Sequence, residues 1–467
     1  MFRNFLEWIR SVIRKMFNGK LIGDKLKVDI AVSTDMIRAI ELWADLYENK
    51  APWLENEDIV SLELPSAIAR EIATLVVLEY KSEITGSARA DWLNEQYKKI
   101  KKELRKQLEY GCAKGGLVIK PYVSGMELSF DFVQADSFFP TEYDSTGKCT
   151  AGIFVCQKIV SDEYYTRLEY HQLQGTTYFV INKAYKSSDK NTLGDPIALD
   201  EIEEWAELEE KTTIKNVKSP LFGYFKTPFA NTVDTTSPLG VSVYSRAIKL
   251  IEEADKQFSR ILWEYEGSEL AIDADVTTLQ QSKVNEKLKL PKLKERLFRA
   301  TGQNKDGSSF YNIFSPEIRD SSLFNGLNNI LKRIEFNCGL AYGTISDPQM
   351  IEKTAEEIKT SKQRSYSTVT DIQGSLEDAL NDTVYAMDVL TTLYHLAPLG
   401  KYETSHEWDD SILVDAKSEQ SIMMQEVNSG IIKKIFYLMK RYGVTKEQAM
   451  EMIPQETEPE ENTEDEE

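Results

Sequence analysis

The sequence predicts an α+β protein that is predominantly helical and has one antiparallel region of strands in its middle third. Apolar residues recur at three- and four-residue steps between Thr34 and Asn94 and again after Gly240, which is the spacing of amphipathic helices. Beyond Gly111 the spacing changes to the alternation of apolar and polar residues that is typical of strands. The content of 41% apolar and 28% charged residues also favours a folded chain over a disordered one.

Residues 1–20 have the pattern of a basic amphipathic helix. Their apolar side chains recur at helical spacing, and four bases stand between them: Arg3, Arg10, Arg14 and Lys15. Such a helix either docks on its own body or on a neighbouring subunit, or it lies on a membrane surface. No run of the sequence approaches the roughly eighteen apolar residues of a membrane span, so we expect no membrane-spanning segment.

Three helices are predicted between Thr34 and Tyr110. Apolar stripes predict the first around Trp43 and the second around Ile72, and the third covers residues 92–110. Six bases surround the apolar line of the third helix: Lys98, Lys99, Lys101, Lys102, Arg105 and Lys106. These bases form either a solvated face or a patch for nucleic acid.

The strands of the middle third are predicted to form an antiparallel meander. The first two are joined at Ser124-Gly125, which has the chemistry of a two-residue hairpin turn. Later strands are separated by turn-rich stretches such as Asp144-Ser145-Thr146-Gly147. The predicted strands are residues 117–123, 126–132, 152–158, 164–171 and 177–185.

The second half of the chain is predicted to be mostly helical. One helix covers residues 244–265 and another covers 321–336, and a strongly basic interval at 269–311 separates them. The longest helix covers 354–395, which at 1.5 Å per residue is roughly 60 Å.

The longest predicted helix has a defined start and one expected bend. It begins with Thr354-Ala355-Glu356-Glu357, a capping box, and Gly374 is the expected position of the bend. After it we expect, in order, a short strand at 411–414, two helices within 417–453 and a disordered acidic tail.

The net charge of −20 excludes a protein whose whole surface is basic. The thirteen residues 455–467 hold eight acids and no base, which leaves −12 over the first 454 residues. Because binding to DNA phosphates requires clustered lysine and arginine, any contact with DNA is local or weak.

The sequence gives no support for a metal, a cofactor or a catalytic residue. The three histidines, His171, His395 and His406, lack the spacing of a zinc site. The four cysteines form no CxxC pair, which predicts free thiols in a reducing compartment.

A DNA-processing nuclease or a packaging enzyme is the alternative interpretation. The segment Gly111-Cys112-Ala113-Lys114-Gly115-Gly116 lacks the spacing and the final Lys-Ser/Thr of a phosphate-binding loop. Glu79-Tyr80-Lys81 supplies the ExK triplet of some metal nucleases, but it falls in a predicted helix. Asp131, Asp136 and Asp144 fall at predicted turns, where aspartate is common for backbone reasons.

A series of short segments carries a family resemblance. They are, in order, Glu41-Leu42-Trp43-Ala44-Asp45-Leu46-Tyr47, the stretch from Gly111 that ends in Asp136-Ser137-Phe138-Phe139-Pro140, Tyr164-Tyr165-Thr166-Arg167-Leu168-Glu169-Tyr170-His171, Ser237-Pro238-Leu239-Gly240, Thr354-Ala355-Glu356-Glu357-Ile358 and Trp408-Asp409-Asp410-Ser411-Ile412. Their order over nearly the whole chain resembles that of tailed-bacteriophage portal proteins of the SPP1-like type.

The resemblance implies a portal fold: a wing of helices and an antiparallel meander, a two-helix stem, a small α/β clip, a long wing helix and a helical crown. The implied segments are an N-terminal helix and arm at 1–33, the wing at 34–240, stem helices at 241–268 and 316–338, the clip at 269–315, a tunnel loop at 339–353, the long wing helix at 354–400, a strand and the crown at 401–454, and the acidic tail at 455–467.

The resemblance also implies a function without catalysis, cofactor or membrane. Twelve copies would form a ring at the capsid vertex of the virion, assembled in the bacterial cytoplasm, through which double-stranded DNA passes during packaging and ejection without sequence-specific contacts. The partners would be the terminase motor, the head-to-tail adaptor, and the major capsid and scaffolding proteins. A net acidic ring suits such a channel, because it repels DNA rather than holding it.

Two sets of site residues follow from the resemblance. The candidates for the lumen, in the tunnel loop, are Ser346, Asp347, Pro348, Gln349, Met350, Glu352 and Lys353. The candidates for partner docking, in the clip, are Lys283, Lys287, Lys289, Lys292, Lys294, Arg296 and Arg299. These bases either meet an acidic partner or phosphates at the channel mouth, or they belong to a solvated loop.

Overall fold

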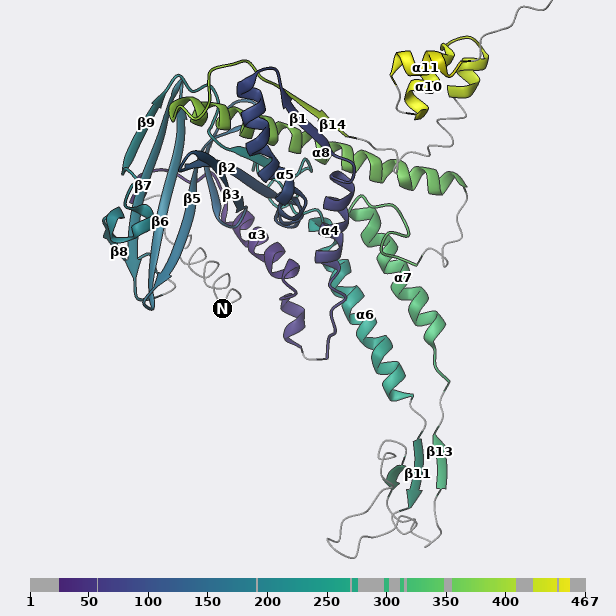
Figure 1. Ribbon diagram of the computed structural model, residues 1–467. Helices are drawn as coiled ribbons and strands as arrows, with labels where there is room; N and C mark the ends of the chain where they lie inside the picture. Colours follow the sequence, from purple (N-terminus) through teal and green to yellow (C-terminus); the bar gives the residue numbers. More distant parts are fainter. Residues whose placement is uncertain are drawn as a thin grey trace, which may run out of the picture. The chain divides into compact units, whose positions relative to one another are not determined.

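The computed structural model contains two compact units (Figure 1), Met1–Trp408 and Asp409–Glu467. It describes residues 25–56, 58–189, 192–268, 271–275, 298–301, 311–314, 317–347, 355–408, 423–442 and 445–453. The predicted N-terminal helix, the cap at Thr354, the strand at 411–414 and the acidic tail lie outside these residues.

Three helices open the first unit: α3 (Thr34–Tyr47), α4 (Leu64–Val76) and α5 (Ala88–Lys114). Ser33 caps α3 by accepting from the Met36 amide, and Ser87 caps α5 by accepting from the Ala90 amide. The third helix is therefore longer than predicted, because its cap lies upstream of the apolar stripe and its end is set by Gly115 at φ +85°.

The strand β1 (Lys81–Thr85) corrects the prediction that Glu79-Tyr80-Lys81 lies in a helix. Helix α4 ends at Val76, and the triplet crosses the turn into β1. The partner of β1 is β14 (Glu403–Glu407), which is antiparallel to it and more than 300 residues later in the chain. Local periodicity cannot reveal so distant a partner.

A three-stranded sheet has the order β10-β2-β3, with β2 (Gly116–Ser124), β3 (Glu127–Gln134) and β10 (Gly223–Lys226). Ser124 pairs with Glu127, so the two-residue turn is Gly125-Met126, one residue later than predicted. Gly125 has φ +63°, a backbone conformation that glycine adopts without the strain of a side chain.

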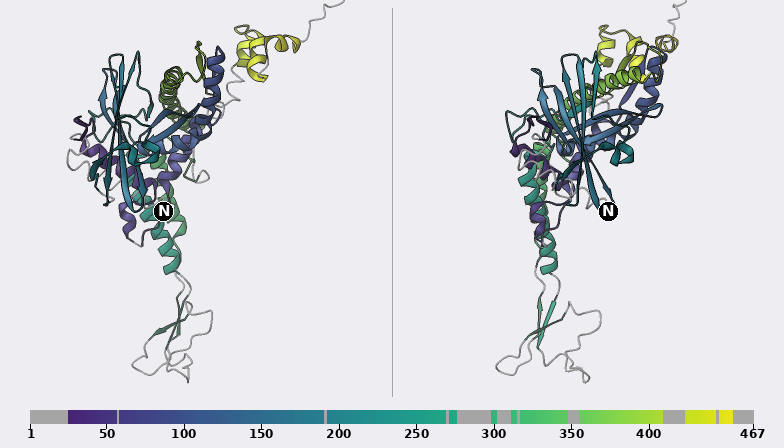
Figure 2. Two further views of the ribbon diagram at one scale, coloured as in Figure 1. Left: turned by 60° about the vertical axis from the view of Figure 1, so that its left-hand side comes forward. Right: turned by 90° about the vertical axis from the view of Figure 1, so that its left-hand side faces the viewer.

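The predicted single meander is divided between two sheets: its first two strands are β2 and β3 of the three-stranded sheet, and its last three belong to a six-stranded antiparallel sheet. The consecutive neighbours of the six-stranded sheet are β4 (Phe138–Tyr143), β5 (Cys149–Val160), β6 (Glu163–Gln174), β7 (Thr177–Ser187) and β8 (Asp195–Ile197), and β9 (Lys211–Lys215) also pairs with β7. The long strands run alongside one another in both views of Figure 2. The segment before α3 adds Leu26, Val28 and Ile30 to the core of this sheet.

A buried ionic network ties the six-stranded sheet to the three-stranded sheet. The Glu169 carboxylate of β6 accepts from Lys120 Nζ of β2 at 2.7 Å, from Arg167 at 2.9 Å and pairs with His171 Nε2 at 2.7 Å. His171 Nδ1 lies 2.8 Å from the Tyr178 hydroxyl. Burial alone would raise the pKa of Glu169, but Lys120, His171 and Arg167 outweigh it and hold that pKa well below its usual range.

Folding stability is expected to fall when the pH drops below about 6.5, the ordinary histidine pKa. Burial lowers the pKa of both His171 and His406, so the unfolded chain binds protons at a higher pH than the folded chain does. Urea unfolding midpoints of the unassembled subunit at pH 7.5, 6.5 and 5.5 would show this fall. His171→Gln should flatten the dependence, whereas His395→Asn, at an exposed position, should not; a flat wild-type profile would contradict the prediction.

Three further helices complete the frame of the first unit. They are α6 (Ile248–Gly267), α7 (Asp320–Asn337) and α8 (Ala355–Leu393). Helices α6 and α7 pack along each other, and the apolar stripe of α8 packs against β2 and β10. With 39 residues, α8 is about 58 Å long at 1.5 Å per residue, and it continues as one helix through Gly374.

A small sheet stands between α6 and α7 in sequence. Its order is β12-β11-β13, where β11 (Ala271–Asp275) is parallel to β12 (Phe298–Thr301) and antiparallel to β13 (Tyr311–Phe314). In the second unit, residues 423–428 are helical and are followed by α10 (Lys434–Tyr442) and α11 (Lys446–Glu451). The described part of this unit thus has three helical segments where two were predicted.

Candidate functional site

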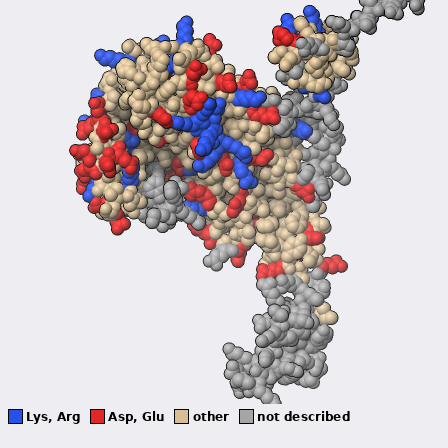
Figure 3. Space-filling view, in the orientation of Figure 1, with Lys and Arg blue, Asp and Glu red and all other residues tan. Residues whose placement is uncertain are grey.

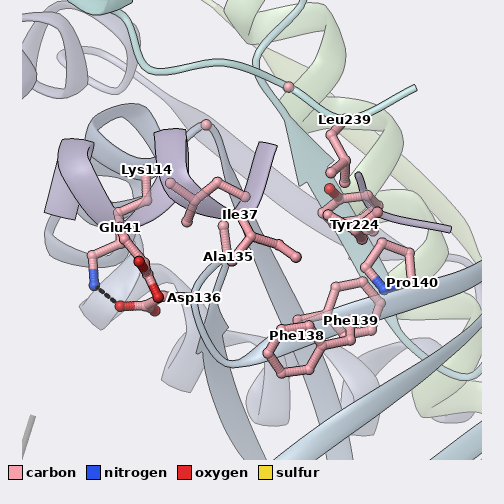
Figure 4. Close-up of a pocket in the computed structure, with 14 residues that line it drawn as sticks. Ile37, Glu41, Lys114, Ala135, Asp136, Phe138, Phe139, Pro140, Tyr224 and Leu239 are labelled. Carbon is pink, nitrogen blue, oxygen red and sulfur yellow. Dashed lines mark hydrogen bonds and ion pairs between the residues drawn. The ribbon is translucent and has the colours of Figure 1, made fainter. Parts of the chain in front are cut away.

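Three of the segments that carry the resemblance meet at one junction (Figure 4). Ile37 and Glu41 come from α3, Lys114 and Asp136 lie at the two ends of the β2–β3 hairpin, and Leu239 belongs to the loop before α6. The junction therefore joins the early helices, both sheets and the start of α6.

A buried ion pair fixes this junction. Lys114 Nζ lies 2.6 Å from Asp136 Oδ2 and also donates to Gln134 Oε1 at 2.5 Å. The two charged side chains are only 3% and 9% exposed, and Glu41 lies beside them in Figure 4. A buried lysine needs such a partner, because leaving either charge alone away from water is costly.

Two backbones cross closely at the same junction. A Cβ atom on Gly115, where φ is +85°, would lie 2.7 Å from the carbonyl oxygen of Gly240. Nearby, Thr227 Oγ1 donates to the Val241 carbonyl at 2.6 Å and accepts from the Val241 amide at 2.9 Å. Glycine is required because any side chain would separate the two backbones, so Gly111–Gly116 serves packing rather than phosphate binding.

The cavity at this junction is too small for a substrate. Its volume is about 30 Å³ and its walls are mostly apolar, including Phe138, Phe139 and Leu239. A space of this size suits about one water molecule. The junction is therefore a structural joint between elements.

The base of the α6–α7 hairpin is tied to the early helices by Asp255. This carboxylate is 2% exposed and accepts from Trp53 Nε1 at 2.9 Å and from the Leu62 amide at 2.8 Å. Ser259 Oγ accepts from the Val60 amide one turn further along. These bonds fix the direction in which α6 leaves the body.

The far end of the hairpin is closed by a forked ion pair. Arg319 donates to both oxygens of Glu264, through Nε at 3.0 Å and through Nη2 at 2.7 Å. The hydrogen bonds from Arg319 lower the pKa of Glu264. Two parallel bonds hold the guanidinium in the plane of the carboxylate, so the hairpin keeps its shape where the small sheet begins.

Apolar side chains on this hairpin are exposed in the single chain. Leu262, Trp263 and Tyr265 of α6 are 39%, 69% and 40% exposed. A pair of packed helices buries one face of each and leaves the other uncovered. An exposed tryptophan in such a group indicates a surface that another chain covers.

A single carboxylate organises the loop after α7. Glu335 is fully buried, and its Oε1 accepts from the amides of Gly343, Ile345 and Ser346 at 3.0, 2.7 and 2.9 Å. Its Oε2 accepts from Ser346 Oγ at 2.9 Å. Converging backbone amides make a site for an anion, and here the anion is the protein's own side chain.

The end of α7 is fixed against α8 as well. Gly339, at φ +73°, follows the helix, and the Leu340 amide donates to the Glu335 carbonyl at 2.9 Å, which is a Schellman ending. The Arg364 guanidinium of α8 lies 4.8 Å from the ring centres of both Phe336 and Tyr342. Two helices thus hold the entrance of the loop.

The predicted lumen residues fall at the edge of this arrangement. Ser346 and Asp347 are described: Ser346 bonds to Glu335, and the Asp347 amide donates to Asn328 Oδ1 at 2.8 Å. The other predicted lumen residues, Pro348, Gln349, Met350, Glu352 and Lys353, lie outside the described residues. The docking candidates lie outside them too, apart from Arg299, whose backbone belongs to β12.

Sequence reasoning missed Glu335, the residue that bonds this loop. The available signal was an acid in an apolar face of a predicted helix, followed after a short interval by Gly339 and Gly343. Such an acid requires buried donors, and a loop rich in glycine can supply backbone amides.

The acids considered for a nuclease do not converge. Asp136 pairs with Lys114, and Asp144 accepts from the amides of its own turn at Thr146 and Lys148. The prediction that Asp131 lies at a turn was wrong: it lies within β3, 3.4 Å from Lys120 of the neighbouring strand. Within the described residues, no three His, Cys, Asp or Glu side chains are placed to hold a metal ion. Each of these three acids has a structural partner.

The described part of the first unit is thus a body of helices and sheets from which a two-helix hairpin projects, with a bonded loop after α7. A comparison with protein families matches residues 33–463 to the family described as phage portal protein, SPP1 Gp6-like. The chain therefore belongs to this family of phage portal proteins. Individual curated proteins give no match.

Membership of the family gives the chain a phage portal role as a component of the virion capsid. The family is structural rather than enzymatic. No helix in the described part of the chain is both long enough and apolar enough to cross a membrane.

Proposed function

We propose that twelve copies of this chain close into a ring at the capsid vertex, and that double-stranded DNA passes through the ring during packaging and ejection. Helices α6 and α7 would be the stem that walls the channel, and the loop after α7 would be the tunnel loop. The segment 269–315 would be the clip, and the second unit would contribute the crown.

The exposed apolar group on α6 carries this proposal. Leu262, Trp263 and Tyr265 would be covered when stems stand side by side, since burying apolar surface drives association. Aromatic residues at the centre of an interface contribute most of its binding energy. A lone hairpin has no such cover for Trp263, which is 69% exposed.

The bonds of Glu335 support a specific role for the tunnel loop. Glu335 holds Gly343, Ile345 and Ser346 to α7, and Asn328 of the same helix holds Asp347. The part of the loop that reaches the lumen would therefore begin at Pro348. Of the lumen candidates, Ser346 and Asp347 would belong to this fixed base, and Pro348, Gln349, Met350, Glu352 and Lys353 would contact passing DNA. Charge agrees with low affinity for DNA, because a ring of subunits with net charge −20 repels phosphates.

The clip would meet the terminase motor first and the head-to-tail adaptor later. The forked pair of Arg319 and Glu264 supports this assignment, since it keeps the two stem helices together at the point where the clip begins. The bases from Lys283 to Arg299 would face acidic surfaces on these partners. Scaffolding and major capsid proteins would contact the outer body during assembly.

Replacing Trp263 with glutamate is expected to prevent ring formation. Loss of a central interface tryptophan typically costs more than about 2 kcal/mol per contact, which is a decrease of roughly thirtyfold or more in the association constant. Mass photometry of the purified protein, with and without scaffolding protein, measures the fraction of rings.

The conservative variant Trp263→Phe is the matched control for this test and should retain rings. Each subunit should keep its thermal unfolding midpoint, because Trp263 is exposed. If Trp263→Glu assembles as the wild type does, the stem contact is wrong. If the wild-type chain stays monomeric in every condition, including with scaffolding protein, the ring itself is wrong.

A further inference from the structure

Four of the five exposed bases of α5 form a stripe along its outer side, and the fifth, Lys99, bonds to Glu127 and Leu128 of β3. The four residues, here called the basic stripe, are Lys98, Lys102, Arg105 and Lys106. The opposite side of α5 is buried through residues such as Leu93, Ile100 and Leu104. The stripe therefore stands on a rigid support, and Figure 3 shows it as the blue area at the centre of the face, over α5.

The basic stripe is only partly neutralised within the subunit. Lys98 pairs with Glu95 at 2.6 Å and Lys106 pairs with Glu103 at 3.4 Å, both within α5 and both with exposed side chains. Exposed pairs of this kind contribute little, and water and salt weaken them. In the part of the chain that the structure describes, Lys102 and Arg105 form no ion pair.

The segment between β8 and β9 carries the opposite charge. Its exposed acids, here called the acidic turn, are Asp200, Glu201, Glu203, Glu204, Glu207, Glu209 and Glu210. Ile202 and Trp205 of the same segment are buried in a small core with Leu199 and Ala184, so this surface is also held in place. Figure 3 shows it as the red area at the left-hand edge.

The two patches lie apart on one subunit, so neither neutralises the other. In a ring of identical copies, each contact joins two different patches of the same chain. Copies that each carry a net charge of −20 repel one another, and the ring therefore needs local attraction between them. The basic stripe, which lies within the described residues, is a patch of positive charge on a subunit whose net charge is negative.

We propose that the basic stripe of one copy docks on the acidic turn of the next copy. The inference rests on the ring proposed above and names a contact by which its copies recognise each other. A second copy fits better than DNA, because the acidic turn is a compact patch of opposite charge, whereas a duplex would meet the stripe on a subunit whose net charge of −20 repels phosphates. Complementary charges would set the orientation in which copies meet.

Charge reversal at two positions in each patch tests the contact. Lys102→Glu with Arg105→Glu should weaken association between copies at least about tenfold at 50 mM salt, since like charges would then face each other. Glu203→Lys with Glu207→Lys should do the same. The variant that combines all four changes should recover rings, because the charges are then exchanged. Mass photometry at 50 and 500 mM salt measures each ring fraction, and high salt should reduce the differences.

Lys218→Glu is the matched control, because it reverses an exposed lysine outside the basic stripe, and it should assemble as the wild type does. Unchanged thermal midpoints of the subunits show that the variants fold. If neither double reversal changes the ring fraction, or if the fourfold variant does not recover rings, this contact is wrong and the ring itself remains supported. If Lys102→Glu with Arg105→Glu still forms rings but no longer binds a DNA duplex, the contact between copies is also wrong and the stripe is a DNA-binding surface. A wild-type chain that forms no ring in any condition overturns both proposals.

Discussion

Glu335→Ala is expected to release the loop after α7 and to lower the free energy of unfolding by about 2 to 4 kcal/mol. The change removes the acceptor of three backbone amides and of the Ser346 hydroxyl. Each buried donor that loses its acceptor costs about 1 to 3 kcal/mol, and the partly exposed amides regain part of this from water. Hydrogen exchange should show faster exchange at the amides of Gly343, Ile345 and Ser346.

The isosteric variant Glu335→Gln distinguishes the acceptor from the charge. Its amide oxygen can still accept from the three backbone amides, so protection of those amides should largely remain. Asn328→Ala should affect the Asp347 amide alone, because Asn328 Oδ1 accepts from that amide. Unchanged protection of all three amides in Glu335→Ala would show that the carboxylate does not hold the loop.

Under the proposed function, Glu335→Ala also affects DNA packaging. A released base would let the lumen part of the tunnel loop adopt many positions. We expect rings of Glu335→Ala to assemble but to package less DNA into procapsids than wild-type rings do. Normal packaging by rings whose three amides have lost protection would show that packaging does not need a fixed loop base.

Glu169→Ala is expected to lower the free energy of unfolding by about 3 to 5 kcal/mol, the usual cost of breaking a buried ion pair. The change leaves Lys120, Arg167 and His171 close together without their common acceptor. The Lys120 and Arg167 side chains are only 6% and 13% exposed, so water replaces the lost partner poorly. Equilibrium unfolding in urea, followed by circular dichroism of the unassembled subunit, measures the loss.

A surface carboxylate provides the control for this experiment. Glu95→Ala removes an exposed ion pair with Lys98 and should leave the unfolding midpoint unchanged. Lys120→Met should cost less in the Glu169→Ala background than in the wild type, because the two residues share one interaction. A loss below about 1 kcal/mol for Glu169→Ala would show that the network does not stabilise the six-stranded sheet.

The sequence predicted those elements whose pattern is local and repeated. The apolar stripe with Val369, Ile372 and Leu376 gave the long helix α8 within about two residues, because the period of 3.6 persists over many turns. Alternation likewise gave β5, β6 and β7. Their boundaries shifted where a cap or a glycine, such as Ser87 or Gly125, decided the end of the element.

Distant partners account for what the sequence did not reveal. The strand β1 gains its hydrogen bonds from β14, so its short pattern alone was read as part of a helix. The local sequence around Asp136 is typical of a turn, and the buried pair with Lys114 forms only in the fold. The partners of Glu335 are likewise revealed only by the fold, since its hydrogen-bond donors come from a loop whose path the sequence does not specify.

The class of fold, the order of the main helices and strands, the excess of negative charge and the family could all be inferred from the amino-acid sequence, because these depend on composition, period and the order of segments. The folded chain was needed to learn which charged side chains are buried together, which apolar side chains stay uncovered on α6, and how Gly115 and Gly240 meet. The physical reason is that burial and pairing are properties of residues brought together from distant parts of the chain, and short-range patterns carry no record of them.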